Sequence, residues 1–225
     1  MVEVKDLYKD YKIGKVVFPA LRGINLKIEE GEFTAIAGPS GSGKTTLLNI
    51  IGCLDTPTKG EVLINGTSIS KLSSREKSEF RKKELGFVFQ TFNLIPVLSS
   101  YENVEMPLIL LNMSSEEQKN KIISILKEVG LGEFIHRRPN EMSGGQQQRV
   151  AVARALVKNP NIVLADEPTT NLDSTTGKEI LEPMRDLNEK FKTTFIFSTH
   201  DQLVMDFAER LIYLRDGKVA SEQQK

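Results

Sequence analysis

A glycine-rich loop with a lysine occurs near residue 40, in the stretch Gly38-Pro39-Ser40-Gly41-Ser42-Gly43-Lys44-Thr45-Thr46. It matches the pattern of a glycine, any four residues and then Gly-Lys-Ser/Thr, which binds nucleotide phosphates. Glycines allow successive backbone N–H groups to point at one anion. The charge of Lys44 suits the β- and γ-phosphates, and the hydroxyl of Thr45 can ligate Mg²⁺. The loop therefore predicts a nucleotide site.

The segments on either side of this loop support the interpretation. Residues 33–37 predict a buried strand that enters the loop, and residues 46–51 predict a helix that leaves it. The phosphates would then lie at a helix N-terminus, where the macrodipole favours negative charge. The alternative, a glycine-rich turn with an accidental lysine, does not account for this strand–loop–helix context.

Two adjacent carboxylates follow another apolar run. Residues 162–167 predict an apolar strand that ends in two carboxylates, Asp166 and Glu167. Beside a phosphate loop, Asp166 is placed to serve Mg²⁺ opposite Thr45. Glu167 is placed to orient an attacking water or to accept its proton. Two acids after a strand can also be an exposed turn, and it is the phosphate loop that favours the catalytic interpretation.

A second glycine-rich turn, Met142-Ser143-Gly144-Gly145-Gln146, opens a predicted helix over 147–157. Ser143 offers a hydroxyl and Gly145 an unhindered backbone N–H at the positive end of that helix, which predicts a second anion site. A helix cap would account for Ser143 alone, but not for two glycines followed by three glutamines.

The overall composition narrows the class of protein. A chain of 225 residues suits one large α/β domain, or a core with an appended subdomain. The formal net charge of zero offers no basic field for nucleic acid or for an anionic membrane surface. Cys53 is the only cysteine, so a disulfide within the chain is excluded and a reducing compartment is expected. In its apolar surroundings, Cys53 is predicted to be a small buried side chain.

Neither a secretory signal nor a membrane span is predicted. Residues 1–6 carry mixed charge and no apolar run. No stretch approaches the roughly 18 apolar residues that a membrane span needs. Work at a membrane would therefore require a partner that holds the protein there.

Strands are predicted around the phosphate loop in the first part of the chain. Residues 2–7 and 20–28 alternate as half-buried strands on either side of a charged turn at 12–15. Residues 60–66 predict a short strand that ends in an Asn-Gly turn, and residues 85–90 a second buried strand.

The middle of the chain has a helical pattern. Residues 71–84 are charged and predict a helix or a loop, and the pattern from 101 to 158 is helical. A capping box formed by Ser114 and Glu117 begins one of these helices, and Gly130 ends it.

The last third alternates strands with a helix. Residues 161–166 and 194–199 predict buried strands, and residues 174–190 a helix that Pro183 should kink or shorten. Residues 210–219 predict a hairpin about an Asp-Gly turn.

These elements predict a single α/β domain. We expect a phosphate-loop NTPase core with a mixed sheet, an N-terminal antiparallel β subdomain and an inserted α-helical subdomain. The core would comprise residues 1–90 and 159–225, and the helical subdomain about 91–158.

On these motifs the chain resembles, over essentially its whole length, the ATP-binding subunit of ABC transporters. Residues 38–45 match the Walker A motif of that family, residues 162–167 its Walker B motif and residues 143–146 its signature. Met142 stands where the family usually has leucine, a change from which little effect is expected.

Three single residues match the family by order and context. They are Gln90 after a strand, Asp173 in Asn171-Leu172-Asp173, and His200 after Phe197-Ser198-Thr199. A lone histidine is more often a capping or surface residue, so only the strand-end context favours a functional His200. The other histidine, His136, is interpreted as a surface residue.

The resemblance implies a role for each matched residue. Tyr11 would stack on adenine, with Tyr8 and Phe18 as rivals, and Gln90 would join Thr45 and Asp166 around Mg²⁺. The residues implied around ATP are Tyr11, Gly38, Pro39, Ser40, Gly41, Ser42, Gly43, Lys44, Thr45, Thr46, Gln90, Ser143, Gly144, Gly145, Gln146, Asp166, Asp173 and His200, and those implied in catalysis are Lys44, Gln90, Glu167 and His200.

The resemblance also implies partners. Two copies would enclose two ATP molecules, with Ser143 and Gly145 contacting the γ-phosphate held by the opposite subunit and Asp173 coupling the two sites. A separate membrane permease would hold the dimer at the cytoplasmic face of the membrane, and no nucleic acid is expected. Residues 49–55, 87–96 and 102–108 resemble the branch with lipoprotein-releasing (LolD-like), macrolide-exporting (MacB-like) and peptide-resistance ATPases, which implies export or extraction.

Other functions were weighed against this one. A cell-division ATPase of the same branch, which signals through its membrane partner, stays open as an alternative. A DNA-repair or chromosome-organising ATPase would carry long coiled coils between Walker A and the signature, and no heptad run occurs here. A kinase would have no use for the signature.

Overall fold

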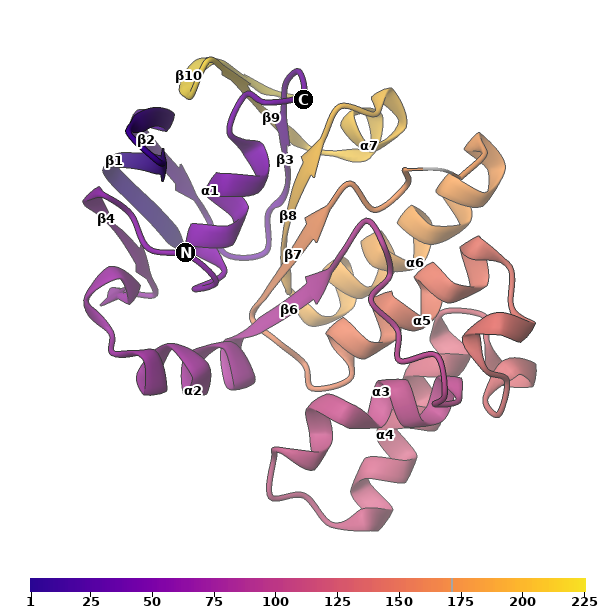
Figure 1. The fold of residues 1–225 in the computed structure, drawn as a ribbon. Coiled ribbons are helices and arrows are strands. Elements are labelled where there is room, and N and C mark those ends of the chain that lie inside the picture. The colour runs from indigo at the N-terminus through magenta and orange to yellow at the C-terminus, as the bar shows by residue number, and fades with distance from the viewer. Residues whose placement is uncertain (171) are drawn as a thin grey trace.

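A six-stranded sheet runs through the centre of the molecule, in the order β10-β9-β3-β8-β7-β6 (Figure 1). The structure is a computed structural model that describes residues 1–170 and 172–225. All neighbouring strands of this sheet are parallel except β10, which runs antiparallel to β9. Its strands are β3 (Phe33–Ala37), β6 (Leu85–Val88), β7 (Ile162–Asp166), β8 (Thr194–Thr199), β9 (Arg210–Arg215) and β10 (Lys218–Gln224).

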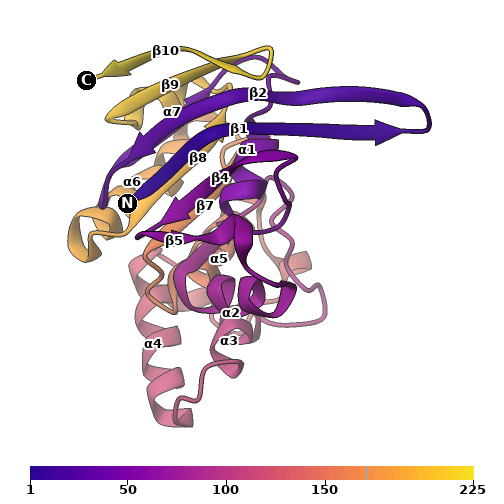
Figure 2. The same cartoon turned by 90° about the vertical axis from the view of Figure 1, so that its left-hand side faces the viewer.

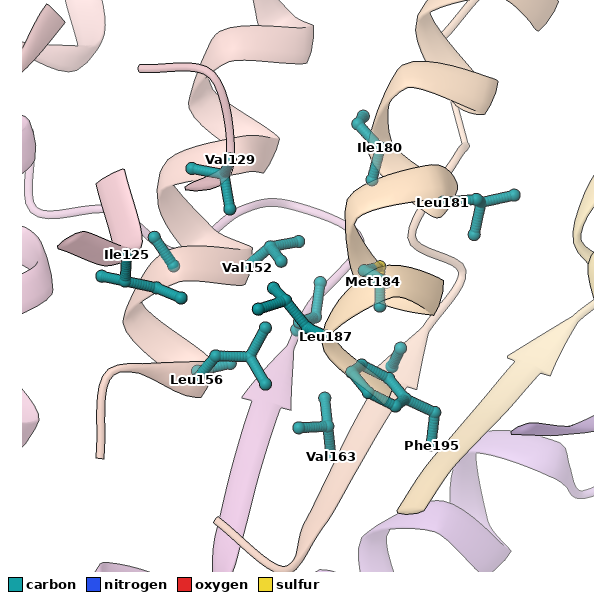
Figure 3. Close-up of a cluster of buried hydrophobic side chains, with 14 of the residues drawn as sticks. Ile125, Val129, Val152, Leu156, Val163, Ile180, Leu181, Met184, Leu187 and Phe195 are labelled. Atoms are coloured by element: carbon teal, nitrogen blue, oxygen red, sulfur yellow. The ribbon is translucent and has the colours of Figure 1, made fainter. Parts of the chain in front are cut away.

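Both faces of the parallel strands are buried, which explains their continuous apolar sequence. Alternate residues belong to two separate apolar clusters, so that Val163 faces one cluster and Leu164 the other. Helices α5 (Gly144–Leu156), α6 (Ser174–Phe191) and α7 (Gln202–Phe207) cover the first face. Figure 3 shows side chains of α5 and α6 packed together over the sheet beside Val163 and Phe195.

The second face is covered by α1 (Lys44–Ile51) and by a four-stranded antiparallel sheet in the order β2-β1-β4-β5. This sheet comprises β1 (Val2–Ile13), β2 (Val16–Ile28), β4 (Lys59–Ile64) and β5 (Thr67–Ser68). Strands β1 and β2 continue beyond the sheet as a long hairpin (Figure 2). The predicted charged turn at 12–15 is shorter than expected, because Ile13 already pairs with Val16.

Three helices and three short 3₁₀ segments lie between β5 and α5 along the chain, and the last two of these helices fall within the predicted helical subdomain of about 91–158. Helix α2 (Ser74–Glu84) precedes β6, and α3 (Ser100–Ile109) and α4 (Ser115–Glu128) follow it. The 3₁₀ segments after α4 are Gly132–Phe134 and Pro139–Glu141, and a third, Ile69–Lys71, precedes α2. Capping boxes begin α2, α3 and α4, including the predicted pair of Ser114 and Glu117. The predicted fold class, with its antiparallel sheet and helical insert, is confirmed.

Several predicted boundaries were wrong. Helix α5 begins at Gly144 instead of Gln147, because the signature glycines form its first turn. Strand β6 ends at Val88 and leaves Gln90 outside the sheet. Helix α6 neither ends nor shortens at Pro183 and runs on to Phe191. Its buried face, on which Met184 and Leu187 follow the proline, stabilises the last turns despite the hydrogen bond that the proline removes.

Two further predictions are confirmed. Cys53 is buried and His136 is exposed. Among the described residues, no helix is long and apolar enough to cross a membrane.

Candidate functional site

The phosphate loop joins the end of β3 to the start of α1, as predicted, and its glycines have conformations that favour glycine. Gly38 has φ 149° and Gly43 has φ 103°. A Cβ at Gly38 would lie 2.2 Å from the carbonyl oxygen of Leu214, and a Cβ at Gly43 would lie 2.7 Å from that of Ala20. Backbone from β9 and β2 therefore packs directly against the loop. A larger residue at Gly38 or Gly43 would clash with this backbone and distort the loop.

Lys44 is a buried cation that is held by the loop itself. Its side chain is 6 % exposed, and Nζ donates hydrogen bonds to the carbonyl oxygens of Gly38 (2.9 Å) and Pro39 (3.1 Å). The same nitrogen lies 3.9 Å from Oε1 of Glu167. A phosphate is a stronger partner for an ammonium group than two neutral carbonyls are, because the hydrogen bond is then charge-assisted.

A hydroxyl and a carboxylate meet beside this lysine. Oγ1 of Thr45, in the first turn of α1, donates to Oδ1 of Asp166 at the end of β7, at 3.1 Å. Mg²⁺ is usually bound by one or two protein oxygen ligands together with substrate phosphates and water. No cluster of three or more His, Cys, Asp or Glu side chains that could hold a metal occurs in the described parts of the chain. The pair Thr45 and Asp166 fits Mg²⁺ that is carried in with a nucleotide.

Glu167 is held in a fixed position by the end of the neighbouring strand. Its φ is 48°, a strained value for a residue with a side chain, and its N–H donates to the carbonyl oxygen of Ser198 at 2.8 Å. Oε1 lies 2.7 Å from Nδ1 of His200, and Oε2 accepts a hydrogen bond from Oγ1 of Thr199 at 3.3 Å. The Glu167 side chain is only 12 % exposed. Strain at a positioned carboxylate points to a functional site.

These groups surround one cavity of about 320 Å³ at the carboxyl ends of the parallel strands. Ligands of open α/β sheets bind at this edge. The lining residues are Ala20, Ser40, Gly41, Gly43, Lys44, Thr45, Thr46, Gln90, Glu167 and His200. All of these except Ala20 belong to the residues predicted from the sequence. An alanine in a strand carries no chemical signal, so sequence reasoning could not have found it.

The second glycine-rich turn lies outside this cavity. Ser143 is exposed and caps α5, where its Oγ accepts from the N–H of Gln146 (3.3 Å) and its own N–H donates to Oε1 of Gln146 (2.9 Å). A Cβ at Gly145 would lie 2.3 Å from Cγ2 of Thr176, so this glycine also allows α5 to pack closely on α6. Within one chain, Ser143 and Gly145 are not brought to the phosphate loop.

Asp173 also caps a helix. Its Oδ1 accepts hydrogen bonds from the N–H groups of Thr175 and Thr176, and its Oδ2 accepts one from the Thr176 hydroxyl at 2.6 Å. The hydrogen bond from the Thr176 hydroxyl is the largest cause of the lowered pKa of Asp173. Asn171, which was matched to the family together with Leu172 and Asp173, lies outside the described residues.

Tyr11 does not line the cavity. Its hydroxyl donates to Oδ2 of Asp55 at 2.8 Å, and Nζ of Lys9 lies 4.8 Å from the centre of its ring. Partial burial is the largest cause of the raised pKa of the Tyr11 hydroxyl. Phe18 pairs with Tyr11 across the hairpin and is exposed, whereas Tyr8 is half-buried under Nζ of Lys59. The adenine-stacking residue stays a prediction.

Comparison with known proteins gives a consistent result. A sequence profile of the family described as "ABC transporter" matches residues 21–170. An ABC transporter ATP-binding protein of Methanocaldococcus jannaschii, MJ0796, is 51 % identical over 100 % of this chain and 97 % of its own length. A solved structure of that cassette, described as a dimeric post-hydrolysis state bound to ADP and Pi, has a TM-score of 0.92 at 50 % identity and covers 100 % of this chain and 98 % of that one.

Longer proteins contain a similar segment. The macrolide export ATP-binding/permease protein MacB of Syntrophobacter fumaroxidans is 45 % identical over 99 % of this chain, which spans 31 % of that protein.

Proposed function

The chain belongs to the ABC transporter family as an ATP-binding subunit, and we propose that two copies close around two ATP molecules and drive a separate membrane permease. Members of this family bind ATP with Mg²⁺ and hydrolyse it to ADP and phosphate. The proposed dimer is supported by the position of Ser143 and Gly145. Both residues lie outside the cavity that is lined by Lys44 and Glu167. A second chain would supply the missing contacts, and the similar archaeal cassette is described as dimeric.

We assign the phosphate contacts to Lys44 and to the backbone N–H groups that the other residues of the phosphate loop offer. Thr45 and Asp166 would hold Mg²⁺, with Gln90 contributing at the cavity wall, and the ion would neutralise charge on the phosphate oxygens. His200, whose Nδ1 is turned to Glu167, would contact the γ-phosphate.

Glu167 would then act on the attacking water. The water oxygen forms a bond to the γ-phosphorus while the bond from that phosphorus to the bridging oxygen breaks, and ADP leaves with the bridging oxygen. The proton of the water passes to the Glu167 carboxylate. The contacts of Thr199 and His200 hold that carboxylate in place before the reaction, which is the arrangement that positioning a nucleophile requires.

The permease would dock on the helical region. We divide the chain into a core of residues 1–90 and 159–225 and a helical subdomain of about 91–158. Large apolar side chains are exposed on this subdomain, among them Val97, Ile109 and Leu110. Exposed apolar residues that gather in one region mark interaction sites. The similarity to MacB, whose name combines export, ATP-binding and permease, supports the proposal that this chain serves an export or extraction system at the cytoplasmic face of the membrane.

The variant Glu167→Gln tests this function. It keeps the size of the side chain but cannot accept the proton of the water, so hydrolysis should slow by about 10²–10⁴-fold. ATP binding should persist, and an ATP-bound dimer should appear on size-exclusion chromatography. Glu189→Gln, an exposed glutamate on α6, serves as the control and should hydrolyse ATP at the unmodified rate. A monomeric, fully active Glu167→Gln variant would contradict the assigned role.

A further inference from the structure

Gln148 is a buried polar side chain that the proposed reaction does not use. It lies in α5, two residues beyond the signature, and is 0 % exposed. Its Nε2 donates a hydrogen bond to the carbonyl oxygen of Pro168 at 2.6 Å. Pro168 directly follows Glu167 in the chain. A helix that begins with the signature is thus bonded to the turn that presents the catalytic carboxylate.

The turn after Glu167 needs such support because its backbone is strained. Glu167 has φ 48°, and its own carbonyl oxygen accepts the N–H of Thr170 at 3.2 Å. On the β8 side, the turn is held by the bond from Glu167 N–H to Ser198 and by the contact of Thr169 with Asp201. Strained conformations persist only when the surrounding structure over-determines them.

On the side opposite β8, the same turn lies next to α5. A Cβ at Gly144 would lie 3.5 Å from Cδ2 of Leu172, so Leu172, shortly after this turn, lies close to the first turn of α5. Among the described residues, Gln148 makes the hydrogen bond that joins an α5 side chain to residues 167–170. Its Oε1 is buried without a hydrogen-bond partner among these residues, an arrangement that calls for an explanation beyond packing.

We propose that Gln148 is a positioning residue for hydrolysis, which ties the signature helix to the turn that orients Glu167. This inference rests on the proposed role of Glu167. Through this bond, a displacement of α5 is passed directly to the peptide that follows Glu167. One chain would in this way link its signature, which contacts the ATP of the opposite subunit, to the carboxylate of its own site.

The test replaces Gln148 by methionine, which has a similar length and no amide hydrogen. The rate of hydrolysis at saturating ATP should fall by about 10- to 100-fold, the loss expected when a reacting group is displaced without being removed. The affinity for a fluorescent ATP analogue should stay within about twofold, because Gln148 does not line the cavity.

The decisive measurement combines this change with Glu167→Gln. If Gln148 acts through Glu167, Gln148→Met should not slow the residual single-turnover hydrolysis of Glu167→Gln any further, because the two effects share one mechanism. An additive loss, an unchanged single variant, or a loss of affinity that parallels the loss of rate would overturn the inference. A fully active Glu167→Gln variant would instead refute the proposed function on which it rests.

A second buried amide provides the matched control. Asn188, on α6, donates from Nδ2 to the carbonyl oxygens of Gly31 (2.8 Å) and Thr193 (2.7 Å), away from the cavity. Asn188→Leu should lower the melting temperature and keep the rate of hydrolysis. If Gln148→Met does not fold, Gln148→Asn keeps the amide but is one methylene too short to reach Pro168, and the same loss of rate is expected.

Discussion

The charged residues of the site already have partners within the chain. Lys44 is bonded to two carbonyl oxygens of its own loop, and Glu167 is bonded to His200 and Thr199. A buried ammonium group without such partners would be strongly destabilising. The carbonyl bonds therefore hold the Lys44 side chain in place until a phosphate replaces them, and the strained backbone of Glu167 directs its carboxylate into the same cavity.

The aromatic residue that holds adenine can be identified by substitution. We expect Tyr11→Ala to weaken ATP binding by about 5- to 150-fold, since stacking of a base on an aromatic ring is worth about 1–3 kcal/mol. Tyr11→Phe should bind ATP nearly as well as the unmodified chain, because the hydroxyl contacts Asp55 and not the cavity. The measurement is a titration with a fluorescent ATP analogue, and a loss that follows Phe18→Ala or Tyr8→Ala instead would assign the stacking to that residue.

At the scale of elements, the first turn of α5 has two requirements to meet. Gly145 is buried and allows the close approach of α6, since a Cβ would lie 2.3 Å from Cγ2 of Thr176, and it is also a residue that we propose to contact the ATP of the opposite subunit. In an ordinary helix, alanine is more stable than glycine by about 1 kcal/mol. Here the clash should exceed that gain, because overpacking of a well-packed contact costs about 1–3 kcal/mol.

Gly145→Ala should therefore have a net cost of up to about 2 kcal/mol and lower the melting temperature by up to about 8 °C, given that 1 kcal/mol corresponds to about 2–4 °C in a chain of this size. The double variant Gly145→Ala with Thr176→Ser should regain most of this loss. Serine removes Cγ2 but keeps the hydroxyl that donates to Asp173. A Gly145→Ala chain as stable as the unmodified one, or no rescue by Thr176→Ser, would show that the contact between α5 and α6 can relax.

Sequence patterns predicted the elements whose causes are local. Short apolar runs predicted strands β3, β7 and β8. The Asp-Gly turn predicted the hairpin at Asp216, and the Ser114 capping box predicted the start of α4. Helix α6 runs through Pro183 because its buried face packs on the sheet, and local propensity contains no information on that packing.

The site, too, could be predicted from the sequence where its residues have a local chemical signature. Nine of the residues that line the cavity carry recognisable chemistry, such as a phosphate loop or a carboxylate at a strand end. The positions of Ala20 at the cavity and of Gln148 beside Pro168 could be identified only from the three-dimensional structure. Ala20 approaches the loop from another sheet, and Gln148 reaches Pro168 across the gap between a helix and a strand end.

At the scale of the whole molecule, one chain presents two incomplete halves of a nucleotide site. The cavity is lined by residues of the phosphate loop together with Gln90, Glu167 and His200, whereas Ser143 caps a helix outside it. If the signature acts across a dimer, Ser143→Arg should abolish hydrolysis and leave the ATP affinity of the single chain within about twofold, because the cavity of that chain is untouched. Loss of all nucleotide binding in this variant would show that Ser143 serves the cavity of its own chain.

Mixing two inactive variants tests the shared site directly. Ser143→Arg keeps an intact phosphate loop, and Lys44→Ala keeps an intact signature, so a mixed dimer contains one complete site and one that lacks both parts. With random pairing, half of the dimers are mixed and each has one of two sites, which predicts recovery of about a quarter of the unmodified rate. Each variant alone should stay inactive at the same total concentration. Exchange of subunits can be followed by fluorescence energy transfer between labelled chains, so that mixed dimers without recovered hydrolysis would contradict a site built from two chains.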